Sequence, residues 1–165
     1  MLLNYDQVLR IKCGRVGIIP YVKRDNKFYF LMGTDVRTGD MCDFGGGCSK
    51  GETNIQAAIR EFMEELKEIL DPHELDIMSC AVYDERNNIC ILFCRVNRPG
   101  FFEDANEMFH SSQVVNQWDE MSEIEWLSAE DMIKNIYGFP SRFWSRVKYA
   151  LKNSADFGEE LLSKL

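Results

Sequence analysis

The stretch FGGGCSKGETNIQAAIREFMEELKEIL, residues 44–70, decides the fold of this chain because it joins a run of three glycines to a helix. Thr53 is a favourable capping residue, and helix formers continue from there until Pro72, so the sequence predicts a helix over residues 53–70. One side of this helix is a broad apolar stripe that has to be buried. The opposite side carries four glutamates, which are Glu61, Glu64, Glu65 and Glu68.

This acidic face places like charges next to each other, at the spacing i, i+3, i+4, i+7. Such pairs cost roughly 0.2–0.5 kcal/mol each in an isolated helix. A face exposed to solvent is the commoner explanation for a run of glutamates. A hard divalent cation would offset the repulsion, because Mg²⁺ and Mn²⁺ take oxygen ligands. The helix by itself leaves both interpretations open.

A wider pattern favours the metal. It reads G-x5-E-x7-R-E-U-x-E-E, where U is a bulky apolar residue, and it runs from Gly46 through Glu52 and Arg60 to Glu65. The pattern resembles the Nudix box, the signature of the Nudix hydrolase family. Seven residues stand at fixed spacing, and the loop and helix are the context that the motif needs. The resemblance implies an α/β fold, a Nudix-type α/β/α sandwich with a mixed β-sheet.

The resemblance also implies a metal site. Glu61, Glu64 and Glu65 would be carboxylate ligands of Mg²⁺ or Mn²⁺, and the backbone carbonyl of Gly46 would be a further ligand. The chemistry of the family is hydrolysis of a diphosphate linkage in a nucleoside diphosphate-linked compound. Water attack on a metal-bound phosphate, assisted by a glutamate base, fits that reaction.

Further catalytic residues follow from the same resemblance. Arg60 would orient the neighbouring glutamates, and Glu52 would hold the loop against the helix. Residues 120–127 look like the strand that follows the box in many family members, where a glutamate can approach the metals or act as the base. Glu120 is the best match and Glu123 the second, so Glu61 and Glu120 are the two candidates for the general base.

The chain departs from the family pattern directly after Glu65. The family has any residue, a glycine and an apolar residue there, whereas this chain has Leu66, Lys67 and Glu68. With no glycine to end it, the helix is expected to continue to Leu70. The ligand positions are unaffected.

Composition restricts the partners and the compartment. At 165 residues, the chain is expected to be a single domain over residues 1–165. A net charge of −8 disfavours unaided binding to a long polyanion, although bound metal still permits a nucleotide. The longest wholly apolar run, residues 89–94, is too short to span a bilayer, and the N-terminus does not resemble a signal peptide. We therefore expect a cytoplasmic, intracellular protein without a membrane partner.

The six cysteines contain no CxxC pair, which makes a zinc site improbable. Three of them lie in apolar runs and are expected to be core residues, namely Cys80, Cys90 and Cys94.

The rest of the chain is expected to form strands and helices around the box. A bent or edge strand is expected at 11–22, and a strand in the middle of the sheet at 89–96. Segment 101–118 holds scattered aromatic residues, including Trp118, without a clean period, so a loop is expected there, and it is the candidate for a lid. Its aromatic residues could stack on a base, but packing in the core is favoured. The other expected strands are 28–32, 75–83 and 120–127, and the later helices are 129–137 and 140–153.

The leading hypothesis is a metal-dependent pyrophosphohydrolase acting on a small soluble nucleotide. Hydrolysis of capped RNA is the alternative, and it requires a basic path that Arg10, Lys12, Arg15, Lys23 and Arg24 could form locally. A nucleotide-sensing domain without hydrolysis would be expected to lose box glutamates, which are all present here. An acidic interaction domain would not bind Mg²⁺ or Mn²⁺. The sequence does not determine the substrate, the number of metals or the oligomeric state.

Overall fold

A computed structural model of the chain describes residues 1–114 and 120–165, with all of their side chains except those at positions 78 and 79. Its described strands form one sheet in the order β1-β6-β7-β2-β3-β4, while β5 also pairs with β2 and β8 with β3. Only the pairing of β2 with β7 is parallel among the described strands, so the sheet is mixed. The strands are β1 (Leu2–Leu3), β2 (Arg15–Arg24), β3 (Lys27–Asp35), β4 (Met41–Cys42), β5 (Phe44–Gly47), β6 (Leu75–Asp84), β7 (Ile89–Val96) and β8 (Met121–Ser128).

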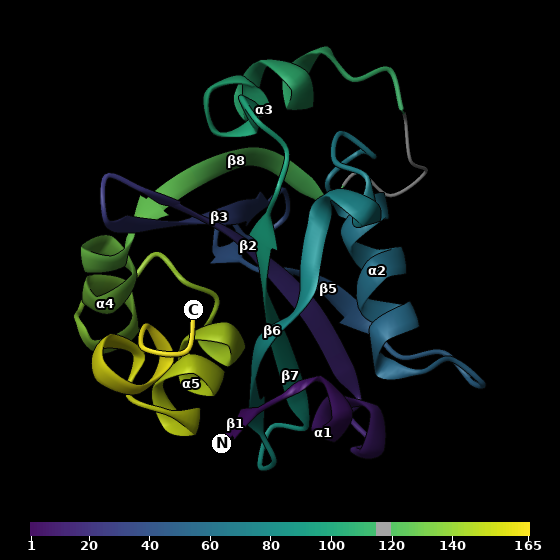
Figure 1. Cartoon of the computed structure of the whole chain (residues 1–165), viewed down its shortest axis with the longest axis vertical. Helices are drawn as coiled ribbons and strands as arrows, with labels where there is room; N and C mark the ends of the chain where they lie inside the picture. Colours follow the sequence, from purple (N-terminus) through teal and green to yellow (C-terminus); the bar gives the residue numbers. More distant parts are fainter. Residues whose placement is uncertain (115–119) are drawn as a thin grey trace.

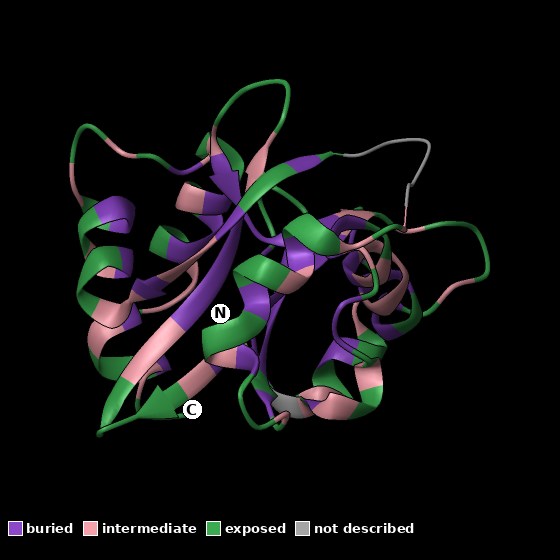
Figure 2. Ribbon diagram, turned by 90° about the horizontal axis from the view of Figure 1, so that it is seen from above, coloured by how far each residue is buried: buried purple, intermediate pink, exposed green. Residues whose placement is uncertain are grey.

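Helices cover both faces of the sheet, with α2 on one side and α4 and α5 on the other (Figure 1). Seen from above, the buried residues follow the strands and the inner sides of the helices (Figure 2). The predicted α/β/α sandwich with a mixed sheet is confirmed. The helices are α1 (Tyr5–Arg10), α2 (Asn54–Glu65), the short η1 (Pro72–Glu74), α3 (Phe101–Ser111), α4 (Ala129–Tyr137), α5 (Ser145–Ser154) and the short η2 (Phe157–Leu161).

The centre of the sheet is apolar on both faces. β7 lies between β6 and β2, as expected, and its residues 89–94 are all buried. Phe30 of β3 packs edge-on against Phe93 of β7 and against Phe157, with ring centroids 5.9 and 5.3 Å apart. Phe157 therefore docks the C-terminal segment onto the sheet, because an aromatic ring buries a large apolar area.

A bent or an edge strand was expected here, and because β2 is a central strand, the edge alternative was wrong. On one side it pairs with β7, and on the other it pairs first with β5 through Ile18 and then with β3 from Tyr21. Pro20 falls between these two partners. A strand proline removes one backbone donor, and here that donor is absent at the point where the partner changes.

The end of α2 also differs from the expectation. The helix ends at Glu65 instead of continuing to Leu70, and Lys67 and Glu68 both have left-handed backbone angles, with φ of 54° and 56°. Lys67 stands where the family pattern has its glycine. The turn carries Leu66 and Leu70 into the core, where both are fully buried. Burial of these two leucines therefore stabilises the turn after α2, although the turn contains no glycine.

Glu68→Gly is expected to stabilise the protein by about 0.5–1 kcal/mol, because glycine has no steric penalty in the left-handed region. Glu68 is exposed, so no packing is lost. Thermal unfolding should show a midpoint raised by about 1–4 °C. Lys67→Gly should gain less, because the Lys67 Nζ lies 4.5 Å from the centre of the Phe109 ring. Glu64→Gly is the control, because a glycine inside the helix should destabilise the protein. If Glu68→Gly destabilised the protein equally, the prediction would be contradicted.

Segment 101–111 forms α3, where a loop was expected. Phe101, Ala105 and Phe109 are buried at intervals of four residues, the spacing of one helix face. α3 packs over β8, with the Phe101 ring 6.2 Å from the ring of Trp126. The segment expected to be a lid therefore begins with a helix that packs against β8. Trp118 lies outside the described residues.

α5 begins at Ser145 and not at Pro140. The Phe139–Pro140 peptide bond is cis, and the following residues are held by β4. Met41 accepts a hydrogen bond from the amide of Trp144 and donates one to the carbonyl of Arg142, each at 2.8 Å. Helix α4 matches its expected range, 129–137.

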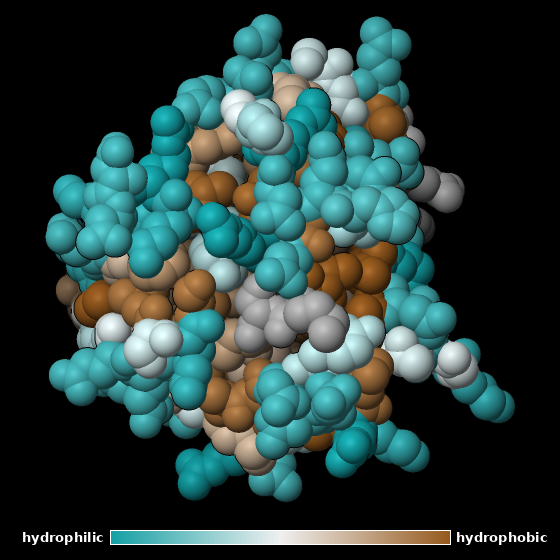
Figure 3. All heavy atoms as spheres, viewed as in Figure 1, coloured by the Kyte–Doolittle hydropathy of each residue, from teal (hydrophilic) through white to brown (hydrophobic). Residues whose placement is uncertain are grey.

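The six cysteines are free thiols, and Cys80, Cys90 and Cys94 are buried, as expected. On the face seen in Figure 3, hydrophilic side chains cover most of the surface, with apolar ones showing between them. Within residues 1–114 and 120–165, no helix combines the length and the hydrophobicity of a transmembrane span.

Candidate functional site

The glycines of β5 leave room for groups that approach them closely. A Cβ on Gly45 would collide with the backbone of Gly17 in β2, and a Cβ on Gly46 would collide with the carboxylate of Glu61. Gly45 thus permits close strand packing, and Gly46 brings its own backbone against a glutamate of α2. Both glycines therefore have a packing role within the protein itself.

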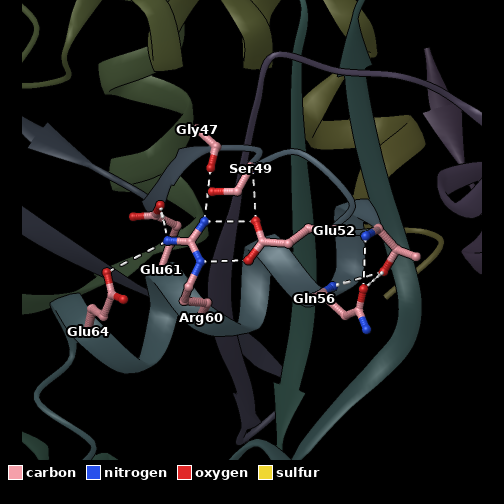
Figure 4. A network of polar contacts seen from close by, with 8 residues as sticks. Gly47, Ser49, Glu52, Gln56, Arg60, Glu61 and Glu64 are labelled. Atoms are coloured by element: carbon pink, nitrogen blue, oxygen red, sulfur yellow. Dashed lines mark hydrogen bonds and ion pairs between the residues drawn. The ribbon is translucent and has the colours of Figure 1, made fainter.

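Arg60 connects the loop after β5 to helix α2 (Figure 4). Its guanidinium donates to both carboxylate oxygens of Glu52, at 2.8 and 3.0 Å, and to the carbonyl of Gly47 at 3.1 Å. It also donates to Glu61 at 2.6 Å and lies 3.8 Å from Glu64. Hydrogen bonds from Arg60 lower the pKa of Glu52 to about 2. Arg60 therefore fixes the loop and the Glu61 carboxylate together.

Glu65 is buried, although the helical pattern placed it on the face opposite the core. Only 7% of the residue is exposed, and its carboxylate accepts a 2.6 Å hydrogen bond from the amide of Gly45. Burial, and then the nearby Asp43 carboxylate, raise the pKa of Glu65 well above its usual range. The glycine strand creates the space that this carboxylate occupies.

Arg15 and Asp43 form a buried ion pair beside Glu65. The Arg15 guanidinium donates to Oδ2 of Asp43 at 2.8 Å and to the carbonyl of Gly45 at 3.0 Å. Burial lowers the pKa of Arg15, but the Asp43 carboxylate outweighs it and the net shift is upward. The other Asp43 oxygen, Oδ1, has no hydrogen-bond partner among the described residues. Arg15 is thus the counter-ion of a buried acidic cluster.

A pocket of about 370 Å³ opens beside the glycine strand. Glu65 and Gly46 line it from one part of the chain, and Glu120 lines it from the residue before β8. The remaining lining residues come from the start of β2 and the residue before it, the end of β3 and the loop after it, β4, β5, the start of β8, and the start of α5 and the residue before it. They are Gly14, Arg15, Asp35, Arg37, Thr38, Cys42, Gly45, Gly47, Met121, Trp144 and Arg146.

The structure thus brings together some of the residues expected from the sequence. Gly46, Glu65 and Glu120 line the pocket, and Glu61 lies against Gly46 but does not line the pocket itself. Arg60 contacts both Glu61 and Glu64 (Figure 4), and neither Arg60 nor Glu64 lines the pocket. Glu123 faces α3, where it contacts His110 at 3.1 Å.

The basic residues near the N-terminus do not form one path. Arg15 lies in the pocket, whereas Lys23 and Arg24 lie at the opposite end of β2 and line a different depression. Arg37, Trp144 and Arg146 line the pocket but were not identified as site residues from the sequence. No local pattern marks them, because their place depends on contacts distant in the chain.

The oxygen atoms around β5 suit a hard divalent cation, which prefers carboxylate and carbonyl ligands. Glu61 lies against Gly46, and Glu65 is hydrogen-bonded to Gly45, so two carboxylates flank the same short segment of backbone. Among the described residues, no three Asp, Glu, His or Cys side chains already converge on one point. Glu61 is held by Arg60, and 54% of the Glu64 side chain is exposed.

Comparison with known proteins matches the chain to a family model and to solved structures of the same fold. A family model described as the NUDIX domain matches residues 14–146. An Ap4A hydrolase from C. elegans, solved as a binary complex, is 19% identical, with a TM-score of 0.54, and the match covers 85% of this chain and 93% of that chain. The Nudix hydrolase RenU from M. smegmatis is 13% identical, with a TM-score of 0.54 and coverage of 84% and 81%. No individual curated protein sequence matches this chain.

Proposed function

Because this chain belongs to the Nudix hydrolase family and is a pyrophosphohydrolase, we propose that it cleaves the diphosphate linkage of a small soluble nucleotide, with Mg²⁺ or Mn²⁺ as cofactor. The observation that carries the proposal is the approach of Glu61 and Glu65 to the Gly45–Gly46 backbone, beside a pocket that Glu120 also lines. The C. elegans neighbour acts on a dinucleoside polyphosphate, Ap4A, and at its low identity this adds a compound to test.

In this proposal, Glu61, Glu64, Glu65 and the carbonyl of Gly46 hold the metal. A divalent cation there would neutralise the negative charge of the phosphate oxygens and would make a water molecule more acidic. Arg60 keeps the Glu61 carboxylate at the glycine strand through their 2.6 Å hydrogen bond. Glu120 is the better-placed general base, because it is exposed at the pocket while Arg60 already binds the Glu61 carboxylate.

The proposal is tested by hydrolysis assays on the purified chain with Mg²⁺ and then Mn²⁺. The substrates are nucleoside triphosphates, a dinucleoside polyphosphate, a nucleotide sugar, ADP-ribose and capped RNA. Turnover of a soluble nucleotide is expected. Cleavage of capped RNA alone would replace the proposal with RNA cap hydrolysis, and metal-dependent binding without any cleavage would indicate a sensing domain.

Arg60→Lys is expected to lower kcat/KM by about 10–100-fold, the usual cost of removing a group that orients metal ligands. Lysine has one amine and cannot reproduce the guanidinium contacts with Glu52, Glu61 and the carbonyl of Gly47. Steady-state kinetics at saturating metal give the value. Arg86→Lys, in the exposed turn between β6 and β7, is the matched control. If the two variants behave alike, Arg60 has no orienting role.

A further inference from the structure

We propose that Arg37 and Arg146 form a phosphate-binding site in the pocket, in addition to the proposed metal site. These two arginines would select substrates with three or more consecutive phosphates. The inference rests on the proposed function, since it concerns the same pocket. Both arginines line that pocket together with Glu65, Glu120 and the glycine strand. They come from two segments far apart in the sequence, the loop after β3 and the first turn of α5.

Arg37 stands on a loop that hydrogen bonds hold in place. Asp35 accepts hydrogen bonds from the backbone amides of Arg37 and Thr38, at 2.8 and 3.0 Å. The Arg37 guanidinium lies 3.2 Å from Asp35, yet 73% of its side chain is exposed. Only 15% of the Asp35 side chain is exposed, but the solvent around the guanidinium weakens the pair and allows Arg37 to exchange Asp35 for a ligand. The backbone of Arg37 is therefore held in place, and its guanidinium is accessible to a ligand in the pocket.

Arg146 is positioned by an aromatic ring. Trp144 is anchored by the hydrogen bond from its amide to the carbonyl of Met41, and its ring has the guanidinium of Arg15 at 5.3 Å and that of Arg146 at 5.6 Å. Such stacking orients a guanidinium but leaves its N–H donors available for an anion. Trp144 is thus a positioning residue for Arg146.

The charges of the pocket indicate a longer phosphate chain than a diphosphate. The metal proposed on the glutamates would neutralise much of the charge of the diphosphate that is cleaved. Arg15 is already compensated by the buried Asp43 carboxylate. Arg146 adds one positive charge, and Arg37 adds a second when its guanidinium exchanges Asp35 for a ligand, in a protein whose net charge is −8. A nucleotide sugar places a neutral group beyond its diphosphate, whereas a polyphosphate places oxygens there that a guanidinium binds in pairs.

The test compares Arg37→Gln and Arg146→Gln with the wild type on ATP and on ADP-ribose, with Mg²⁺. For each variant we expect kcat/KM on ATP to fall about 10–100-fold, the usual effect of losing a charged hydrogen bond. On ADP-ribose we expect a change within about threefold, because its diphosphate does not extend to the arginines. Arg86→Gln removes the same charge outside this pocket and should leave both substrates unchanged. Equal losses on ATP and ADP-ribose would overturn the inference but leave the proposed function intact.

A binding measurement makes the test independent of catalysis. Inorganic tripolyphosphate is titrated into each full-length protein by calorimetry without added metal. We expect binding about tenfold weaker in each pocket variant than in the wild type or in Arg86→Gln. If the pocket variants bind tripolyphosphate more weakly but the wild type hydrolyses no nucleotide, the proposed function is wrong and the phosphate-binding site of Arg37 and Arg146 is supported. Equal tripolyphosphate affinity in all four proteins would overturn the proposal that Arg37 and Arg146 bind phosphate, whichever substrate the enzyme cleaves.

Discussion

Glu65→Gln is expected to abolish hydrolysis, with kcat reduced on the order of 10³-fold or more, because removal of a metal ligand takes away several kcal/mol of transition-state stabilisation. Glutamine has the shape of glutamate, and its carbonyl oxygen still accepts the hydrogen bond from the amide of Gly45. The fold should therefore survive the change. Glu64→Gln should have a similar effect on kcat, and its exposed side chain makes no demand on the fold.

The stability of Glu65→Gln separates loss of chemistry from loss of structure. The pKa of Glu65 is raised by burial and by Asp43, so the ionised form destabilises the folded protein and stability falls as pH rises through that pKa. At pH 7.5 in EDTA, the variant should unfold at the same temperature as the wild type or at a higher one. Glu123→Gln is the control, because Glu123 lies outside the pocket and is 62% exposed. An active Glu65→Gln enzyme would overturn the ligand assignment.

The parts of the structure that depend on local sequence could be predicted. Thr53 caps α2 as expected, with Gln56 completing a reciprocal pair of hydrogen bonds. The buried run of β7 identified the middle of the sheet. Each of these features is fixed within a few residues of chain.

The burial of Glu65 could not be predicted, because a helical wheel assumes that only one face is covered. α2 packs against both β2 and β5, and the glycines of β5 leave space on the flank where Glu65 lies. The pocket itself has a similar origin. Trp144 is held at the site by its hydrogen bond to Met41, more than a hundred residues earlier in the chain, and its ring lies against Arg15. No periodicity or spacing records such a contact.

Arg15→Met is expected to destabilise the protein by about 3–5 kcal/mol, the typical cost of leaving a buried charge without its partner. Arg15 is the cation beside two buried carboxylates, Asp43 and Glu65, and 13% of its side chain is exposed. Asp43 is fully buried, so in the variant its carboxylate loses its counter-ion without gaining contact with water. Urea unfolding measured in EDTA gives the free energy directly.

Two further variants decide whether this destabilisation comes from the unpaired charge. Arg15→Met combined with Asp43→Leu removes both charges, and it should recover most of the stability, since an apolar pair in place of a buried ion pair is often close to neutral. Arg142→Met breaks the exposed pair between Arg142 and Glu125, whose side chains are 56% and 46% exposed, and should cost no more than about 1 kcal/mol. If Arg15→Met were as mild as Arg142→Met, the Asp43 carboxylate would have to be compensated by another group. If the double variant were as unstable as Arg15→Met, the hydrogen bond from Arg15 to the carbonyl of Gly45 would be the dominant contribution, because neither variant can form it.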